Sequence, residues 1–152
     1  MKGLLLVAAL WLGAVGAQAK PNFSGAWKLV ADRSDFGFFP LPEKLEQEIE
    51  HTDPDLKLKQ IQSAQQGEVT VEFSYSTDGK ETSNQVRGVP VKTVMNWDED
   101  ALKMEYKLTF QGNDVTVSER WVMAEDGKTY SVSRKIASPQ GDIEMKLVLE
   151  KK

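Results

Sequence analysis

From residue 23 to residue 150, apolar and polar side chains alternate in short runs that are separated by turn-forming residues. The clearest run places Val69, Val71, Phe73 and Tyr75 on one face, with polar residues between them. A period of two is typical of half-buried β-strands. The runs predict antiparallel strands at about 23–30, 44–51, 56–62, 68–76, 81–86, 91–97, 102–110, 115–122, 130–136 and 143–149.

The segments between the runs are rich in Gly, Asp and Gln. Asp-Gly-Lys occurs at 78–80 and 126–128, and Gln-Gly occurs at 66–67, 111–112 and 140–141. Asp-Gly readily adopts the positive backbone angles that a tight hairpin needs. Because no segment is long enough for a crossover, we expect an up-and-down meander of hairpins.

Two of the runs depart from a simple alternating strand pattern. Residues 44–51 are rich in helix formers, but Leu45 and Ile49 alone make a thin helical stripe, and we therefore favour a strand. Residues 81–86 are polar, and we expect this strand at an edge or gap of the sheet.

About ten strands at roughly 8–12-residue spacing fit either a sandwich or a barrel. A meander with one apolar face per strand buries all those faces at once only by curling on itself, and closure also removes exposed edges. We therefore predict an all-β domain over residues 20–152, a single up-and-down antiparallel β-barrel of about 8–10 strands.

The first 19 residues have the features of a secretory signal peptide. Lys2 supplies a positive start, residues 4–15 are apolar, and Ala17-Gln18-Ala19 is a small-x-small cleavage site. The apolar run is shorter than the roughly 18–20 residues that span a bilayer. We expect residues 1–19 to be a signal peptide, with no stable membrane anchor and a periplasmic or secreted destination.

Composition excludes several classes. The chain has 152 residues and no Cys, which removes disulfides, thiolate catalysis and cysteine metal sites. Its net charge is −4 with the signs interspersed, and nucleic-acid binding needs clustered positive charge instead. A hydrophobic content of 40% argues against disorder.

The first predicted strand contains a Gly-x-Trp pattern, formed by Gly25 and Trp27 and flanked by Phe23, Lys28 and Leu29. A glycine in a strand lets a bulky ring or another backbone come close, and a Trp two residues later points to the same face and can plug one end of a barrel. This segment resembles the first-strand signature of the calycins, the lipocalin and fatty-acid-binding-protein superfamily. The chain is also similar to small exported bacterial lipocalin-like proteins. The resemblance implies a barrel that binds a small apolar molecule, such as a fatty acid or another lipid, in its interior without a cofactor, and we expect a monomer.

The lid departs from that resemblance. Residues 32–42 are too short and too rich in Pro and Gly for the helix-turn-helix lid of fatty-acid-binding proteins. Any lid is therefore a loop, with Phe36, Phe38 and Phe39 as its plug, and we expect the entrance there.

The last strand departs as well. It carries Glu144, Lys146 and Glu150 where fatty-acid-binding proteins have an Arg-x-Tyr pair that holds a carboxylate. In lipocalins an Arg from one of the last strands stacks on the Trp of the first strand. In this chain, Arg134 and Lys146 are both candidates to stack on Trp27.

Arg134 and Glu119 are the charged residues that fall on otherwise apolar faces, in adjacent predicted strands. They fit an internal pair in which Arg134 meets a ligand carboxylate bidentately. The alternatives are a purely structural ion pair, and a register slip or β-bulge that turns one of them outward. The other predicted ligand contacts are side chains on apolar faces, for which core packing is the alternative: Phe73, Tyr75, Met95, Tyr106 and Tyr130, with Phe38 from the lid.

Chemistry other than binding finds little support. His51 is the single histidine, and one imidazole with the nearby Asp53 and Asp55 is a weak metal signal. No nucleophile motif is present, so we expect no metal, no cofactor and no catalysis. The alternative functions are an interaction or inhibitor module with a filled core, acting through its outer face and loops, and an enzyme of unrecognised type. A cavity of about 300 Å³ or more would favour the binder over the filled module.

Overall fold

The computed structural model describes residues 19–152. Apart from its last residue, the expected signal peptide lies outside the described residues, and export therefore stays a prediction. Within residues 19–152 the chain forms ten strands and one short 3-10 helix. They are β1 (Gly25–Leu29), η1 (Ala31–Arg33), β2 (Lys44–Thr52), β3 (Asp55–Ala64), β4 (Gly67–Ser76), β5 (Thr82–Val86), β6 (Val89–Asp98), β7 (Ala101–Phe110), β8 (Asn113–Met123), β9 (Thr129–Ser138) and β10 (Gly141–Lys151).

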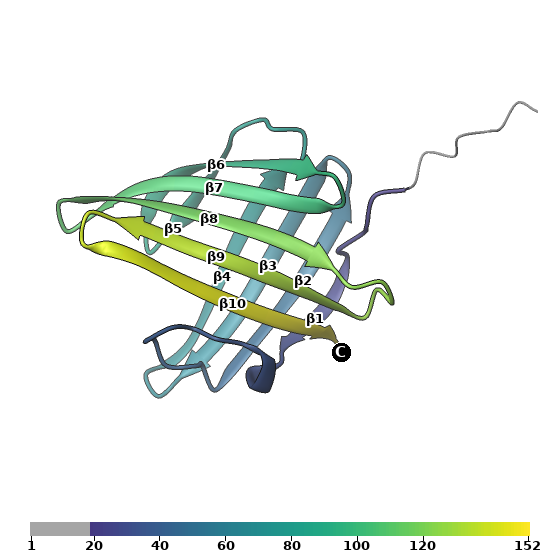
Figure 1. The fold of residues 1–152 in the computed structure, drawn as a ribbon, viewed down its shortest axis with the longest axis horizontal. Helices are drawn as coiled ribbons and strands as arrows, with labels where there is room; N and C mark the ends of the chain where they lie inside the picture. The colour runs from purple at the N-terminus through teal and green to yellow at the C-terminus, as the bar shows by residue number, and fades with distance from the viewer. Residues whose placement is uncertain (1–18) are drawn as a thin grey trace, which may run out of the picture.

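All the strands belong to one sheet, in the order β4-β3-β2-β1-β10-β9-β8-β7-β6-β5. The sheet curls into a barrel (Figure 1), in which β1 pairs antiparallel with both β2 and β10. Strands consecutive in sequence are neighbours in space, and the predicted all-β up-and-down barrel is confirmed. Residues 44–52 form a strand rather than a helix, because their alternating face packs into the barrel.

The ladder of backbone hydrogen bonds is open at one place. β4 and β5 are the two ends of the strand order, so the expectation that closure removes every edge is wrong here. The buried side chain of Asn84 on β5 bridges the gap. Its Oδ1 accepts from the Ser74 N–H at 2.8 Å, and its Nδ2 donates to the Ser74 carbonyl at 2.9 Å. One carboxamide therefore replaces a backbone pair, and the polar strand lies at a gap, as its sequence predicts.

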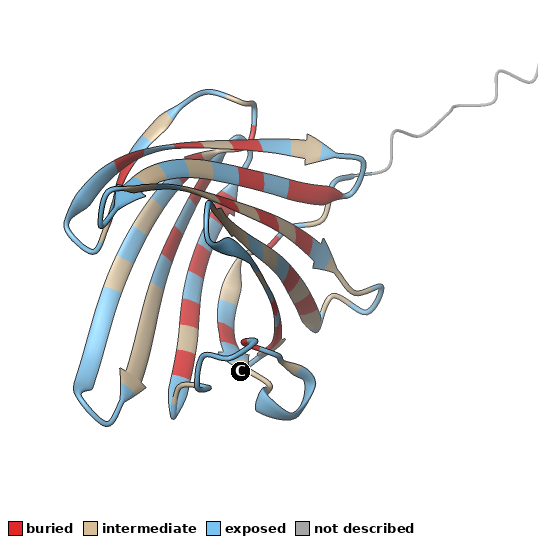
Figure 2. Ribbon diagram, turned by 60° about the vertical axis from the view of Figure 1, so that its left-hand side comes forward, coloured by how far each residue is buried: buried red, intermediate tan, exposed pale blue. Residues whose placement is uncertain are grey.

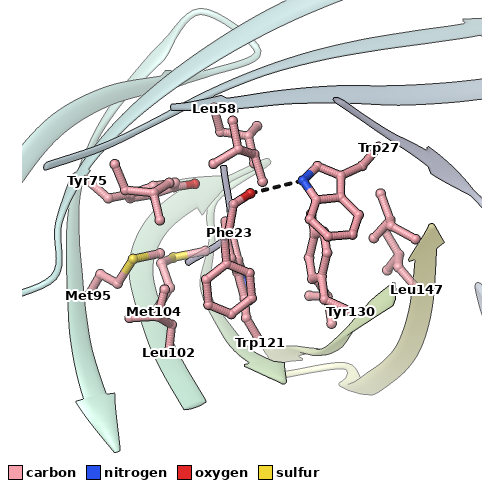
Figure 3. Packing of buried hydrophobic residues seen from close by; sticks show 14 of the residues in the cluster. Phe23, Trp27, Leu58, Tyr75, Met95, Leu102, Met104, Trp121, Tyr130 and Leu147 are labelled. Atoms are coloured by element: carbon pink, nitrogen blue, oxygen red, sulfur yellow. Dashed lines mark hydrogen bonds between the residues drawn. The ribbon is translucent and has the colours of Figure 1, made fainter. Parts of the chain in front are cut away.

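One end of the barrel is filled with aromatic side chains, which we call the aromatic plug: Phe23, Trp27, Trp121 and Tyr130. Phe23 and Trp27 have no solvent exposure, and Trp27 Nε1 donates to the Phe23 carbonyl at 2.9 Å (Figure 3). The Phe23 ring meets Trp121 and Tyr130 edge-on, at centroid distances of 5.7 and 5.4 Å. Trp27 thus fills one end of the barrel, in line with the Gly-x-Trp pattern.

Gly25 lies beside the plug in a backbone conformation that residues with a side chain rarely adopt. Its φ is +140°, and a Cβ there would lie 3.4 Å from Lys151 Cε and 3.6 Å from Trp27 Nε1. Lys151 Nζ lies 5.4 Å from the Trp27 ring centroid. The cation over the first-strand Trp is therefore Lys151, and neither Arg134 nor Lys146 takes that place, because the β1–β10 register sets Trp27 opposite Lys151.

The segment before β1 is tied across the filled end. The Phe23 N–H donates to His51 Nδ1 at 3.1 Å, and Ser24 Oγ exchanges hydrogen bonds with the backbone N–H and carbonyl of His51, at 2.8 and 3.1 Å. His51 Nε2 lies 2.7 Å from Asp53 Oδ1. The single histidine thus anchors the Phe23 end of the plug to β2.

The Asn84 bridge generates a stability prediction. Asn84→Leu keeps the size of the side chain but leaves the N–H and carbonyl of Ser74 without partners in the gap. We expect the free energy of unfolding to fall by about 1–3 kcal/mol, measured by urea denaturation, and the Ser74 amide to exchange its hydrogen faster. The control Gln85→Leu, on the exposed face of the same strand, should stay within about 0.5 kcal/mol of the parent. An Asn84→Leu protein of unchanged stability, with slow Ser74 exchange, would show that other contacts hold the gap.

Candidate functional site

The half of the barrel away from the aromatic plug is only partly filled. Along the inward face of β3, Leu56 and Leu58 are buried whereas Gln62 is only half-buried. Along β4, Tyr75 is 5% exposed and Val69 is 61% exposed. Figure 2 shows the same gradient, with the buried segments of β3, β4 and β7 toward one end of the barrel. Packing therefore loosens from the plug toward the end where the β3–β4 hairpin lies.

An interior cavity of about 240 Å³ occupies the middle of the barrel. One part of its wall is apolar and comes from several strands: Leu58, Val71, Phe73, Val86, Met104 and Val132. The rest of the wall contains polar side chains: Gln47, Gln60, Arg87, Tyr106, Glu119 and Arg134. The space is therefore amphipathic.

A second hollow, which we call the mouth, has a volume of about 700 Å³ and lies beside the interior cavity. It is bordered by residues 39–43 of the loop before β2 and by residues 62–66 around the β3–β4 hairpin. Asp35 pairs with Lys146, which holds this loop against β10. Arg87 and Arg134 border both hollows, so two guanidinium groups stand where the cavity meets the mouth.

The phenylalanines of the loop have different positions. Phe36 is 7% exposed and Phe39 borders the mouth, but Phe38 is 77% exposed and borders neither hollow. Gly37 has φ +64° and donates its N–H to Asp35 Oδ1, and the Phe39 N–H donates to the Phe36 carbonyl. The resulting turn directs Phe38 outward, away from both hollows, and its role as a ligand contact stays a prediction.

Glu119 and Arg134 face each other across β8 and β9 and form an ion pair inside the barrel. Arg134 Nε donates to Glu119 Oε2 at 2.7 Å, and Trp121 Nε1 donates to Glu119 Oε1 at 3.0 Å. Both carboxylate oxygens are thus occupied. Within residues 19–152 no protein partner is found for the two terminal nitrogens of the Arg134 guanidinium.

Burial acts to lower the pKa of Arg134, but the adjacent Glu119 carboxylate outweighs it and raises that pKa above the ordinary value. Arg134 therefore stays charged at the inner border of the mouth, with one edge held by Glu119 and the terminal edge available.

The predicted contacts divide by depth. Phe73, Tyr75, Tyr106, Glu119 and Arg134 line the interior cavity. Met95 and Tyr130 are each 1% exposed, lie in the filled half and border neither hollow. The period-two pattern identifies the inward face of each strand but not the depth at which a residue lies, which is why these two were placed in the site.

Four polar residues of the site are not among those that the sequence predicts: Gln47, Gln60, Gln62 and Arg87. Gln47 shares the inward face of its strand with Leu45 and Ile49, so the alternation itself was a usable signal. Arg87 follows β5 in a tight turn with φ +51°, and no periodicity marks it.

Other chemistry has a weak structural basis. His51 has both ring nitrogens engaged, one with the Phe23 N–H and one with Asp53, so neither serves as a base toward a substrate. In the described part of the chain, no three His, Asp or Glu side chains are grouped to hold a metal ion. The same residues include no helix with the length and apolarity needed to cross a bilayer.

Comparisons with known proteins identify the fold. Neither a protein-family model nor a curated protein matches this sequence. A secretary abundant heat soluble (SAHS) protein from Ramazzottius varieornatus is similar in structure, with a TM-score of 0.65 and 16% identity over 89% of this chain and 98% of that one. Zebrafish ileal bile acid-binding protein, solved with cholic acid, has a TM-score of 0.60 and 15% identity, over 86% of this chain and 98% of that one. Fatty-acid-binding protein 1 of Echinococcus granulosus has a TM-score of 0.56 and 12% identity, over 85% of this chain and 96% of that one. These likenesses confirm the up-and-down β-barrel, and at such identities they show the fold alone.

The three tyrosines provide a test of the interior. Burial raises the pKa of Tyr75 and Tyr130 well above the ordinary 10.0, and it raises the pKa of Tyr106 as well. Because the folded pKa values are raised, the stability that the neutral phenols contribute is complete below about pH 10 and is lost as pH rises through the folded values.

We expect the folded protein at pH 10 to show far less phenolate absorbance than the protein unfolded in urea, which is about half ionised there. Tyr106→Phe should remove the earliest step of the folded titration. If all three phenols were half ionised near pH 10 while the circular dichroism remained native, the interior would be wetter than described.

Proposed function

We propose that this protein binds a small, largely apolar molecule reversibly in the open half of its barrel and performs no chemistry on it. The observation that carries the proposal is the interior cavity, which lies beside the mouth and shares two lining residues with it. The interior cavity alone, at about 240 Å³, is smaller than the roughly 300 Å³ that is usual for small-molecule sites, and the adjoining mouth of about 700 Å³ supplies the additional space.

The lining supports a hydrophobic ligand with a polar group. Leu58, Val71 and Phe73 offer an apolar wall, and burial of a ligand's apolar surface there gains about 25 cal/mol per Å². Two of the structural neighbours are by title a bile acid-binding protein and a fatty-acid-binding protein. Their shared barrel supports the same class of ligand for this chain.

The rival of a filled interaction module fits the structure less well. Such a module would pack its interior throughout, whereas this barrel keeps an interior cavity even though its buried core extends from the aromatic plug to Phe36, Leu45 and Met145. Catalysis has weaker support still, since the one histidine is fully engaged on both ring nitrogens.

The polar anchor that we propose is Arg134. Arg134 borders both hollows, its terminal nitrogens have no protein partner among the described residues, and Glu119 fixes its other edge. A planar guanidinium held in this way suits bidentate recognition of a ligand carboxylate.

The first test blocks the cavity. Val71→Trp places an indole in the interior cavity, whereas the control Glu72→Trp adds the same indole on the exposed face of β4. We expect saturable binding of the fluorescent apolar probe anilinonaphthalene sulfonate to the parent and the control. Binding to Val71→Trp should be at least about tenfold weaker, equivalent to 1.4 kcal/mol. No saturable binding to the parent refutes the proposal, and unimpaired binding to Val71→Trp places the probe outside the barrel.

The second test concerns the anchor. Removing Arg134 alone leaves the Glu119 carboxylate buried without a cationic partner, which destabilises the folded protein. The variant is therefore Glu119→Gln combined with Arg134→Met. We expect its affinity for dodecanoic acid to fall about tenfold or more, because a charge-assisted hydrogen bond is lost. Dodecanol should bind within about twofold of the parent. Glu119→Gln alone is the matched control, and an equal loss for acid and alcohol would remove Arg134 from the site.

A further inference from the structure

Three glutamines form a continuous polar row on one inner wall of the barrel, which we call the glutamine ladder: Gln47 on β2, and Gln60 and Gln62 on β3. Gln47 Nε2 donates to Gln60 Oε1 at 2.9 Å, and Gln60 Nε2 lies 3.4 Å from Gln62 Oε1. At the inner end, the Tyr130 hydroxyl donates to Gln47 Oε1. The row therefore starts at the aromatic plug and runs outward to the mouth.

The ladder lies in the same hollows as the arginine anchor. Gln47 is 5% exposed, and it borders the interior cavity together with Gln60 and Arg134. Gln62 borders the mouth. Arg134 therefore shares the interior cavity with Gln47 and Gln60, and it shares the mouth with Gln62.

The hydrogen bonds within the ladder give it a direction. Every side-chain carbonyl oxygen already accepts a bond, from Tyr130, Gln47 and Gln60 in turn. A primary amide has two N–H groups, and each bond along the row uses one of them. Within residues 19–152 no partner is found for Gln62 Nε2. The groups left for a ligand therefore include at least one N–H donor on each glutamine, and each oxygen keeps one further lone pair.

Such donors discriminate between ligands. A saturated chain lying against the ladder removes water from the amide N–H groups and offers no hydrogen-bond acceptor in its place. The loss of those hydrogen bonds makes the free energy of binding less favourable. A ligand that carries an oxygen acceptor at this place restores the lost hydrogen bonds. Sites built around buried polar groups reject analogues that lack the matching group for this reason.

We infer that the glutamine ladder is a second polar subsite, which selects amphipathic acids that carry a keto or hydroxyl oxygen along their apolar body over plain saturated acids. The inference rests on the proposed function and refines its ligand class. The acid group lies at Arg134, and the apolar body lies between the ladder on β2 and β3 and the apolar side chains of β4 and β5.

The experiment compares three probes of equal chain length: octadecanoic acid, and the octadecanoic acids with a hydroxyl or a keto group at mid-chain. For the parent protein, we expect both oxygenated acids to bind about fivefold or more tightly than the plain acid, the gain expected for one hydrogen bond. The keto acid, which can only accept, should keep the preference.

In Gln60→Leu and, separately, in Gln62→Leu, the ratio of the affinity for the oxygenated acids to the affinity for the plain acid should fall toward one. The plain acid should still bind both variants. Gln140→Leu, an identical change in the exposed β9–β10 turn, should leave the preference intact. In spectra of the labelled protein, the side-chain amide signals of Gln60 and Gln62 should shift more with the keto acid than with the plain acid.

The outcomes distinguish a failure of the proposed binding function from a failure of the glutamine subsite. If none of the three acids binds the parent, the proposed function itself fails. If all three bind equally, or if the preference survives both ladder variants, binding stands and the glutamine ladder is not a subsite.

Discussion

A barrel of ten strands encloses more volume than its inward-pointing side chains readily fill. The two ends of this barrel differ in how that extra volume is occupied. At one end the aromatic plug takes it up, and Phe23 and Trp27 lose all contact with solvent. At the other end the surplus remains as the interior cavity and the mouth. The filled half provides most of the hydrophobic stabilisation, which leaves the open half free to carry polar groups that a core would not accept.

The two halves are joined through Trp121. Its ring lies 5.7 Å from Phe23 and 5.8 Å from Tyr130, centroid to centroid, and its indole N–H donates to Glu119. Glu119 in turn holds Arg134. The orientation of the guanidinium is therefore set by the packing of the plug, and the ion pair is part of the fold as well as part of the candidate site.

Much of the fold was readable from the sequence, because a period of two marks a strand and its inward face without reference to the rest of the chain. Glu119 and Arg134 were found by counting along two such strands. What the pattern does not contain is depth and local geometry. Met95 shares an inward face with the rest of its strand but lies in the filled half, and the direction of Phe38 depends on a single turn at Gly37.

Cross-strand geometry explains the other misses. The glutamine ladder depends on Gln47 standing opposite Gln60, and the cation over Trp27 depends on the register of β1 with β10. Such pairings are decided by turns and by contacts between distant segments, which a single alternating strand does not reveal. The gap between β4 and β5 was foreseen from the polarity of β5, but its bridging by Asn84 required the structure.

The pairing of β1 with β10 also orders events during folding. Lys28 stands opposite Glu150, so the first strand of the barrel finds one of its two neighbours only when the chain is made through the last strand. Hairpins such as β2–β3 and β7–β8 join residues that are close in sequence and form early, whereas closure at β1 is the most non-local pairing in the molecule. Without β10, β1 has only β2 as a pairing partner, and Trp27 lacks the cation of Lys151 over its ring. The first strand of the barrel is therefore completed only by the last.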